Sequence, residues 1–114
     1  MEVRPARPAE RTTICGVLNA AMLSVDDDAL RRGTTLVAAA DGRIVGALVL
    51  DDEHIAAVAV RPGRRGQGVG TALVEAGAAR RDRLTADFDP GVRPFYESLG
   101  FDVERSNGRC HGVR

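Results

Sequence analysis

The stretch Val58-Ala59-Val60-Arg61-Pro62-Gly63-Arg64-Arg65-Gly66-Gln67-Gly68-Val69-Gly70-Thr71 decides the fold of this chain, because it leads from a strand into a helix. Its first residues are apolar, Pro62-Gly63 breaks the strand, and helical spacing begins at Gly68. At such a helix start the backbone N–H groups are unpaired, and the helix dipole adds positive charge. Glycines let a ligand approach the backbone closely. The stretch therefore predicts an anion site suited to a phosphate or pyrophosphate, with Arg61, Arg64 and Arg65 adding charge.

Two familiar phosphate-binding motifs do not fit this turn. Gly63 and Gly68 have the spacing of a P-loop, but Val69 stands where that motif requires lysine. Gly66 and Gly68 could begin a dinucleotide-binding fingerprint, but Thr71 stands where its third glycine belongs. The alternative is a tight strand-to-helix turn that binds nothing. Alternate glycines beside three arginines favour the anion site.

The remaining sequence divides into short strands and helices around this turn. Asp41-Gly42 is a strong hairpin signal between two apolar runs. The expected strands are residues 3–6, 35–40, 43–50, 54–60, 84–88, 101–105 and 109–113. The expected helices are one after Pro8 with an apolar face of Ile14, Val17, Leu18, Ala21 and Met22, then 27–32, 68–81 and 92–99. This order predicts an α/β (α+β) fold in which a mixed, mostly antiparallel sheet has helices on both faces.

Length and composition indicate one globular domain over residues 1–114. The 114 residues are 44% hydrophobic and 28% charged, which is ordinary for a folded domain. Sixteen basic and sixteen acidic residues balance, which argues against a nucleic-acid partner. No apolar run is long enough to span a bilayer. Two scattered cysteines and no secretion signal predict a cytoplasmic protein with reduced thiols, and two histidines with these cysteines do not form a metal site.

Two blocks of this sequence resemble the GNAT superfamily of N-acetyltransferases. Arg65-Gly66-Gln67-Gly68-Val69-Gly70 matches the [Q/R]-x-x-G-x-[G/A] signature of that family. Pro94-Phe95-Tyr96-Glu97-Ser98-Leu99-Gly100-Phe101 resembles its second block, in which a tyrosine precedes a Gly-Phe pair. Two blocks in the right order are more specific than either alone. The resemblance spans the chain, although the first-helix region and the C-terminal hairpin are short for the family.

The resemblance implies acetyl-CoA as co-substrate and a sheet that splays open beside the strand over 54–60. The pantetheine arm would lie against this strand like an added strand, beside Val58 and Val60. The oxyanion donor would be a backbone N–H of the same strand, with Val58 as the best single position. The pyrophosphate would lie on the turn, bound mainly by backbone N–H groups. The turn residues expected to bind it are Arg65, Gly66, Gln67, Gly68, Val69, Gly70 and Thr71. Asp89 lies near where many relatives bond the pantetheine through asparagine.

The resemblance also implies the catalytic groups. Tyr96 would be the general acid to the coenzyme A sulfur; its alternative is a core aromatic beside Phe95 and Phe101. Counting back eleven residues from Arg65, as histone-type relatives place a glutamate, gives His54. Imidazole titrates near neutral pH and suits a base, and Glu53 beside it could serve directly or through water. Ordered water without a dedicated side chain stays open as well.

The function expected from the resemblance is direct acetyl transfer from acetyl-CoA to a primary amine. The acceptor would be a small molecule or a peptide, and the sequence does not identify it. A homodimer through edge strands is expected from relatives. Two rivals stay open: a non-catalytic acyl-CoA-binding module of the same fold, and an unrelated phosphate-binding α/β protein.

Overall fold

The computed structural model describes residues 1–20, 25 and 27–114. Its strands and helices follow the expected order. The strands are β1 (Glu2–Pro5), β2 (Thr34–Ala40), β3 (Arg43–Asp51), β4 (His54–Val60), β5 (Thr85–Phe88), β6 (Asp102–Ser106) and β7 (Arg109–Val113). The helices are η1 (Pro8–Glu10), α1 (Arg11–Ala20), α2 (Asp27–Arg32), η2 (Pro62–Arg64), α3 (Val69–Ala78), η3 (Pro90–Val92) and α4 (Arg93–Ser98). Ala21 and Met22, expected on the first helix, lie outside the described residues.

The described strands form one seven-stranded sheet in the order β1-β2-β3-β4-β5-β7-β6. All neighbours are antiparallel except β4 and β5, which run parallel. Asp41 and Gly42 have φ angles of 54° and 76°, as the predicted tight turn between β2 and β3 requires. The mixed, mostly antiparallel sheet is therefore confirmed. Its outer strands are β1 and β6, where an edge-strand homodimer stays a prediction.

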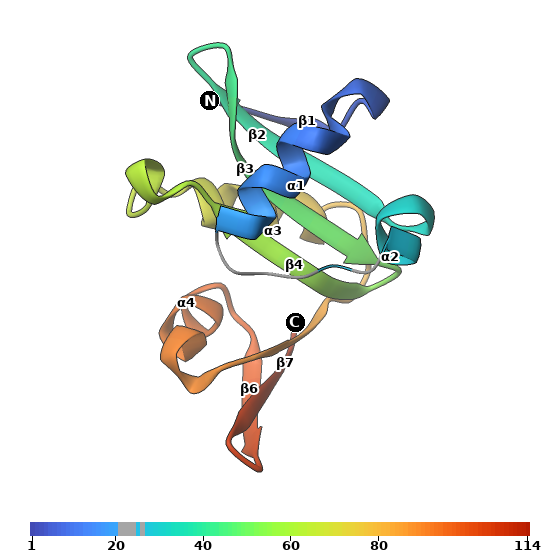
Figure 1. Ribbon diagram of the computed structural model, residues 1–114. Helices are drawn as coiled ribbons and strands as arrows, with labels where there is room; N and C mark the ends of the chain where they lie inside the picture. The colour runs from blue at the N-terminus through green and yellow to red at the C-terminus, as the bar shows by residue number, and fades with distance from the viewer. Residues whose placement is uncertain (21–24, 26) are drawn as a thin grey trace.

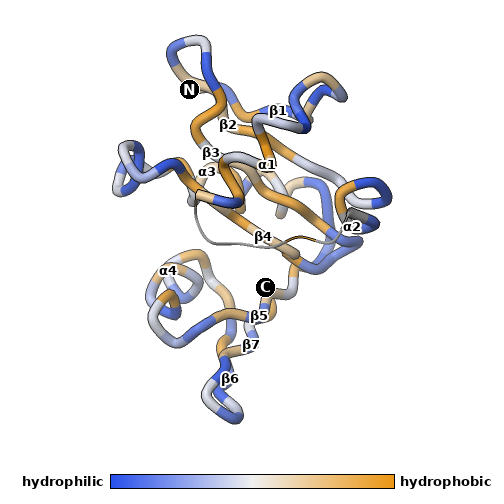
Figure 2. Tube along the Cα trace, viewed as in Figure 1, coloured by the Kyte–Doolittle hydropathy of each residue, from blue (hydrophilic) through white to orange (hydrophobic). Residues whose placement is uncertain are grey.

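Helices cover both faces of the sheet, as expected (Figure 1). β3 is buried along nearly its whole length because both of its faces are covered. On one face α1 packs Ile14, Val17 and Leu18 against the sheet. On the other face α3 contributes Val69, Leu73 and Val74 to the main core. Figure 2 shows the resulting pattern, with apolar central strands and hydrophilic hairpin tips and turns.

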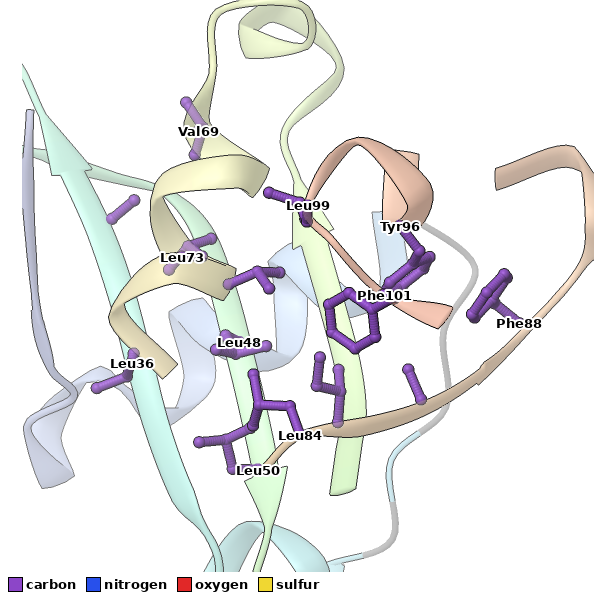
Figure 3. Close-up of a cluster of buried hydrophobic side chains, with 14 of the residues drawn as sticks. Leu36, Leu48, Leu50, Val69, Leu73, Leu84, Phe88, Tyr96, Leu99 and Phe101 are labelled. Carbon is purple, nitrogen blue, oxygen red and sulfur yellow. The ribbon is translucent and has the colours of Figure 1, made fainter. Parts of the chain in front are cut away.

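The main core extends from α3 to the C-terminal part of the chain. Figure 3 shows Leu73 of α3 over Leu48 of the sheet, Phe101 of the C-terminal part on the other side of Leu48, and Tyr96 between Phe101 and Phe88. Gly77 allows this close packing, since a Cβ there would lie 2.9 Å from a methyl group of Leu48. A buried Leu or Phe contributes about 1.5–3 kcal/mol relative to exposure. This shared core fixes the two parts of the sheet on either side of the site described next.

Candidate active site

The sheet opens between β4 and β5. These strands pair only at His54↔Thr85 and Ile55↔Ala86. Just beyond, Leu50 pairs with Ile55 but Val49 pairs with Ala57, so Ala56 is an extra residue in β4. Such a bulge bends its strand and increases the twist. A pocket of about 590 Å³ lies along the opening, lined by β4, the glycine turn, the end of β5 and α4.

The edge of β4 that faces this pocket carries unpaired backbone groups. Arg61 N–H bonds the Val45 carbonyl of β3 at 2.8 Å. N–H groups alternate in direction along an extended strand, so those of Ala57 and Ala59 also face β3. Those of Val58 and Val60 therefore face the opening. Both residues line the pocket, and their binding roles stay predictions.

The first turn of α3 supplies more free donors at one end of the pocket. Ala72 N–H makes the first intrahelical bond, 3.0 Å from the Gly68 carbonyl. The N–H groups of Val69, Gly70 and Thr71 precede it. The N-cap residue is Gly68, and no side chain among the described residues caps the helix there. The first turn carries no acidic residue, so its dipole is not neutralised locally. Gly66, Gly68, Val69, Gly70 and Thr71 all line the pocket.

The glycines of the turn serve two different purposes. Gly66 and Gly68 have φ angles of 78° and 81°, which favour glycine, and a Cβ there would meet nothing within 4 Å. Gly70 has no such angle, but its Cβ would lie 3.3 Å from the Phe95 ring and 3.7 Å from a Val60 methyl group. A methyl group at position 70 would therefore press on the Phe95 ring, so packing favours glycine there.

Of the three arginines near the turn, Arg65 is the one open to a ligand. Arg61 donates its Nε to the Ile44 carbonyl at 2.8 Å. Arg64 lines the pocket, but its Nη2 lies 2.7 Å from Asp41. Arg65 is exposed, lines the pocket, and forms no ion pair with the described residues. Its Nε donates a long hydrogen bond of 3.4 Å to the Val60 carbonyl. Gln67 is exposed and lies outside the pocket wall, so its binding role stays a prediction.

Tyr96 lines the pocket from α4 and is held by aromatic rings on three sides. Its ring stacks on Phe88 with 4.1 Å between centroids. Phe95 and Phe101 meet the ring edge to face at 5.1 Å and 5.3 Å. Burial raises the pKa of Tyr96 to about 12. The phenol therefore stays protonated at neutral pH and can donate a hydrogen bond into the pocket.

The two expected bases lie just outside the pocket wall. His54 begins β4, where its Nδ1 lies 2.8 Å from the Thr85 hydroxyl. Glu53 precedes it, and its carbonyl accepts a 2.9 Å bond from Thr85 N–H. Both residues are partly exposed and lie at the closed end of the β4–β5 opening. Their roles as base stay predictions.

At the pocket mouth, Asp89 is joined by a residue that sequence reasoning missed. Asp89 lines the pocket, and its carboxylate lies 2.7 Å from Arg109 Nη1. Arg109, Ala56 and Asp87 also line the pocket without having been predicted to do so. Arg109 and Ala56 carry no local motif. Asp87 does carry a signal, because it alternates with buried residues on the strand that follows the glycine-turn helix.

Solved structures of acetyltransferases are among those that share this fold. Naa50 of Arabidopsis thaliana, in complex with a bisubstrate analogue, is 14% identical with a TM-score of 0.81, over 98% of this chain and 95% of that one. A GNAT family acetyltransferase from Elizabethkingia anophelis, with acetyl-CoA bound, is 19% identical with a TM-score of 0.76, over the same shares. A histone acetyltransferase HPA2-related protein from Corynebacterium glutamicum is 20% identical with a TM-score of 0.81, over 97% and 93%.

The sequence itself carries the family. Residues 31–103 match the model of the acetyltransferase (GNAT) domain, which is well over half of the chain. The chain therefore belongs to the GNAT family and is an acetyl-CoA-dependent N-acetyltransferase. No curated protein matches it. Within the described residues, no helix is long and apolar enough to cross a membrane.

Proposed function

We propose that this chain binds acetyl-CoA in the β4–β5 pocket and transfers the acetyl group directly to a primary amine of a small molecule or peptide. One observation carries the proposal: the free edge of β4 and the free N–H groups of the α3 first turn open into the same pocket. The free edge of β4 suits an extended arm that carries amides, and the N–H groups of α3 suit a pyrophosphate. Acetyl-CoA supplies an activated thioester.

The cofactor-binding groups follow from this placement. The N–H groups of Val69, Gly70 and Thr71 bind the pyrophosphate, with Gly66 and Gly68 letting it approach. The exposed guanidinium of Arg65 adds charge at the same end, and Gln67 flanks it. Val60 N–H bonds the pantetheine arm, and Asp89 bonds it near the pocket mouth.

Two groups act on the reacting atoms. Val58 N–H faces the opening and donates to the oxygen that becomes negative as the amine attacks the carbonyl carbon. Tyr96 donates to the coenzyme A sulfur as the carbon–sulfur bond breaks. A phenol with a pKa of about 12 is a weak acid, so this donation stabilises the departing thiolate more than it transfers a proton.

The acceptor amine must lose a proton before or during its attack, since alkylammonium is not nucleophilic. His54 is the group on which that proton ends, with Glu53 or ordered water as its alternatives. Because Cys15 and Cys110 are free thiols, a reducing compartment such as the cytoplasm suits the protein.

Calorimetry with acetyl-CoA, followed by thiol release over a panel of primary amines, tests this function. We expect acetyl-CoA to bind, and Arg65→Ala to weaken binding severalfold and to reduce its salt dependence. Arg83→Ala is the matched control, since Arg83 is an exposed arginine after the other end of α3. Equal binding of unrelated nucleotides, with none of acetyl-CoA, would show a general phosphate site instead.

A further inference from the structure

A row of titratable side chains crosses one face of the sheet beside the pocket. On β5, Asp87 alternates with buried Ala86 and Phe88, so it points away from the aromatic cluster. His111 of β7 lies directly opposite Asp87, and Glu104 of β6 lies directly opposite His111. Residues directly opposite one another on paired strands share a face. Asp87, His111 and Glu104 thus run from the pocket wall toward the sheet edge.

Asp87 is held between two imidazoles. One carboxylate oxygen, Oδ1, lies 2.7 Å from His111 Nδ1. The other, Oδ2, lies 3.7 Å from His54 Nε2. The second ring nitrogen of His54 lies 2.8 Å from the Thr85 hydroxyl, which fixes the ring from its far side. The side chains of Asp87, His54 and His111 are about half exposed, so they can exchange protons with solvent.

Two neighbouring carboxylates, Asp89 and Asp51, have arginine partners. Asp89 also lines the pocket, but it pairs with Arg109 at 2.7 Å. Asp51 lies opposite His54 across β3 and β4, and it pairs with Arg32 at 2.8 Å. Arginine keeps its proton at any ordinary pH, whereas imidazole gains and loses one near neutrality. Asp87 is thus the pocket carboxylate whose partners can take a proton.

A metal site is the first alternative reading of this cluster. Among the residues that the structure describes, no three His, Cys, Asp or Glu side chains are grouped so that they could hold a metal ion. The cluster also connects the pocket to the expected base. Asp87 lines the pocket, His54 lies outside it, and the two side chains face each other.

We propose that Asp87 is the catalytic residue that receives the acceptor's proton, and that His54 Nε2 carries it away. This inference rests on the proposed function. The N–H bond of the ammonium breaks toward Asp87 Oδ2, its electron pair stays on nitrogen, and that nitrogen attacks the thioester carbon. The carbon–sulfur bond then breaks with its electron pair going to sulfur, and the attacking nitrogen loses its second proton to that sulfur, which leaves the amide and the free thiol of coenzyme A. His54 Nε2, 3.7 Å away from Asp87 Oδ2, takes the first proton when the two half-exposed side chains close to hydrogen-bond distance, and passes it to solvent. His111 is a positioning residue, because its Nδ1–H holds the other carboxylate oxygen.

Kinetics of matched variants test this assignment, using an acceptor from the amine panel. Asp87→Asn keeps the shape of the side chain and removes its basicity. We expect kcat to fall about 100-fold near neutral pH, with acetyl-CoA affinity by calorimetry unchanged within about twofold. The loss should shrink at high pH, where free amine is already abundant. Asp102→Asn is the control, since it removes an exposed carboxylate on β6 that lies outside the site.

The histidines give a second, independent readout. His54→Gln and His111→Ala should each shift the acidic limb of the pH–rate profile. His111→Asn should restore much of the loss of His111→Ala, because an amide N–H can still donate to Asp87. If Asp87→Asn melts below the control, Asp87→Ser repeats the measurement.

An Asp87→Asn profile that superimposes on that of Asp102→Asn would overturn the assignment, as would a requirement for His54 with none for Asp87. Both outcomes leave acetyl-CoA binding and the proposed function intact. A wild-type chain that neither binds acetyl-CoA nor acetylates any amine fails at the proposed function itself, and the role of Asp87 fails with it.

Discussion

Tyr96 has a structural role in the core, and we propose a chemical role for the same side chain. Its ring packs against Phe88, Phe95 and Phe101. The sequence offered this core position as the alternative to a general acid. The same residue lines the pocket, which is the position that a donor to the sulfur needs. The two interpretations are therefore compatible, and a substitution that keeps the ring separates them.

Tyr96→Phe removes only the hydroxyl. We expect turnover to fall about tenfold to a thousandfold, the range of general acid–base contributions, while acetyl-CoA affinity and melting temperature change little. Steady-state kinetics and calorimetry on the same preparation measure both. Normal turnover would leave Tyr96 with its packing role alone.

Gly70→Ala tests packing, because Gly70 contacts the Phe95 ring whereas Gly66 and Gly68 adopt positive φ angles. The new Cβ would press on the Phe95 ring, so the free energy of unfolding should fall by about 1–3 kcal/mol, as overpacking costs. Urea denaturation measures it. The double variant Gly70→Ala/Phe95→Leu should recover part of the loss. An unchanged stability with weakened acetyl-CoA binding would assign Gly70 to the ligand alone.

The sequence predicted the residues of the glycine turn because their signal is local. Glycine spacing and the start of helical periodicity are properties of neighbouring residues. Asp87 and Arg109 enter the site through the pairing of β5 with β7, which joins segments far apart in the chain. The opening lies beside the extra residue Ala56, and nothing in the alanine-rich run of β4 marks which residue bulges.

Among the elements, boundaries were less predictable than order. The helix expected to reach Arg81 ends at Ala78, where the N–H groups of Arg80 and Arg81 bond carbonyls only three residues back. The Arg81 side chain then reaches the end of the sheet. Its Nε bonds the Asp52 carbonyl at 2.9 Å, and its Nη2 bonds the Thr34 hydroxyl at 3.1 Å. These partners lie far away in the sequence. The helix after Pro8 likewise begins with a separate 3₁₀ turn, Pro8–Glu10.

The link between β1 and η1 should make the molecule sensitive to acid. Arg4 binds both carboxylate oxygens of Glu10, at 2.8 Å and 2.7 Å. That bond, with one from Arg7 N–H, lowers the pKa of Glu10 to about 2. A carboxyl whose pKa is lower in the folded state stabilises the fold above its unfolded value of 4.5. This stabilisation is lost as pH falls from 4.5 toward 2.

Glu10→Gln tests whether the charge of Glu10 stabilises the fold. The variant should melt below the wild type at neutral pH, and the difference should narrow as pH falls through this window. Thermal melts at stepped pH values measure it. Glu97→Gln is the control, since Glu97 sits in an exposed i,i+4 pair with Arg93 that contributes little. A difference that stays constant with pH would contradict the role of the Glu10 charge.

For the whole molecule, the shortest strand pairing in the sheet is that of β4 with β5. Two residue pairs connect strands that otherwise diverge around the pocket. A ligand lying along β4 would bond Val58 and Val60, so hydrogen exchange over residues 56–60 should slow when acetyl-CoA is added. At a hundredfold excess over Kd the free energy of unfolding should rise by about 2.7 kcal/mol. Exchange measured by mass spectrometry checks the location, and unchanged exchange at residues 56–60 under saturation would place the ligand elsewhere.

The stack of Tyr96 on Phe88 has a spectroscopic consequence. The chain contains one tyrosine and no tryptophan. Its tyrosine fluorescence and its near-ultraviolet dichroism from tyrosine therefore arise at a single point, on the wall of the pocket where α4 meets β5. Docking of the C-terminal part during refolding and arrival of a ligand in the pocket would both be reported by this one native chromophore, with no label attached.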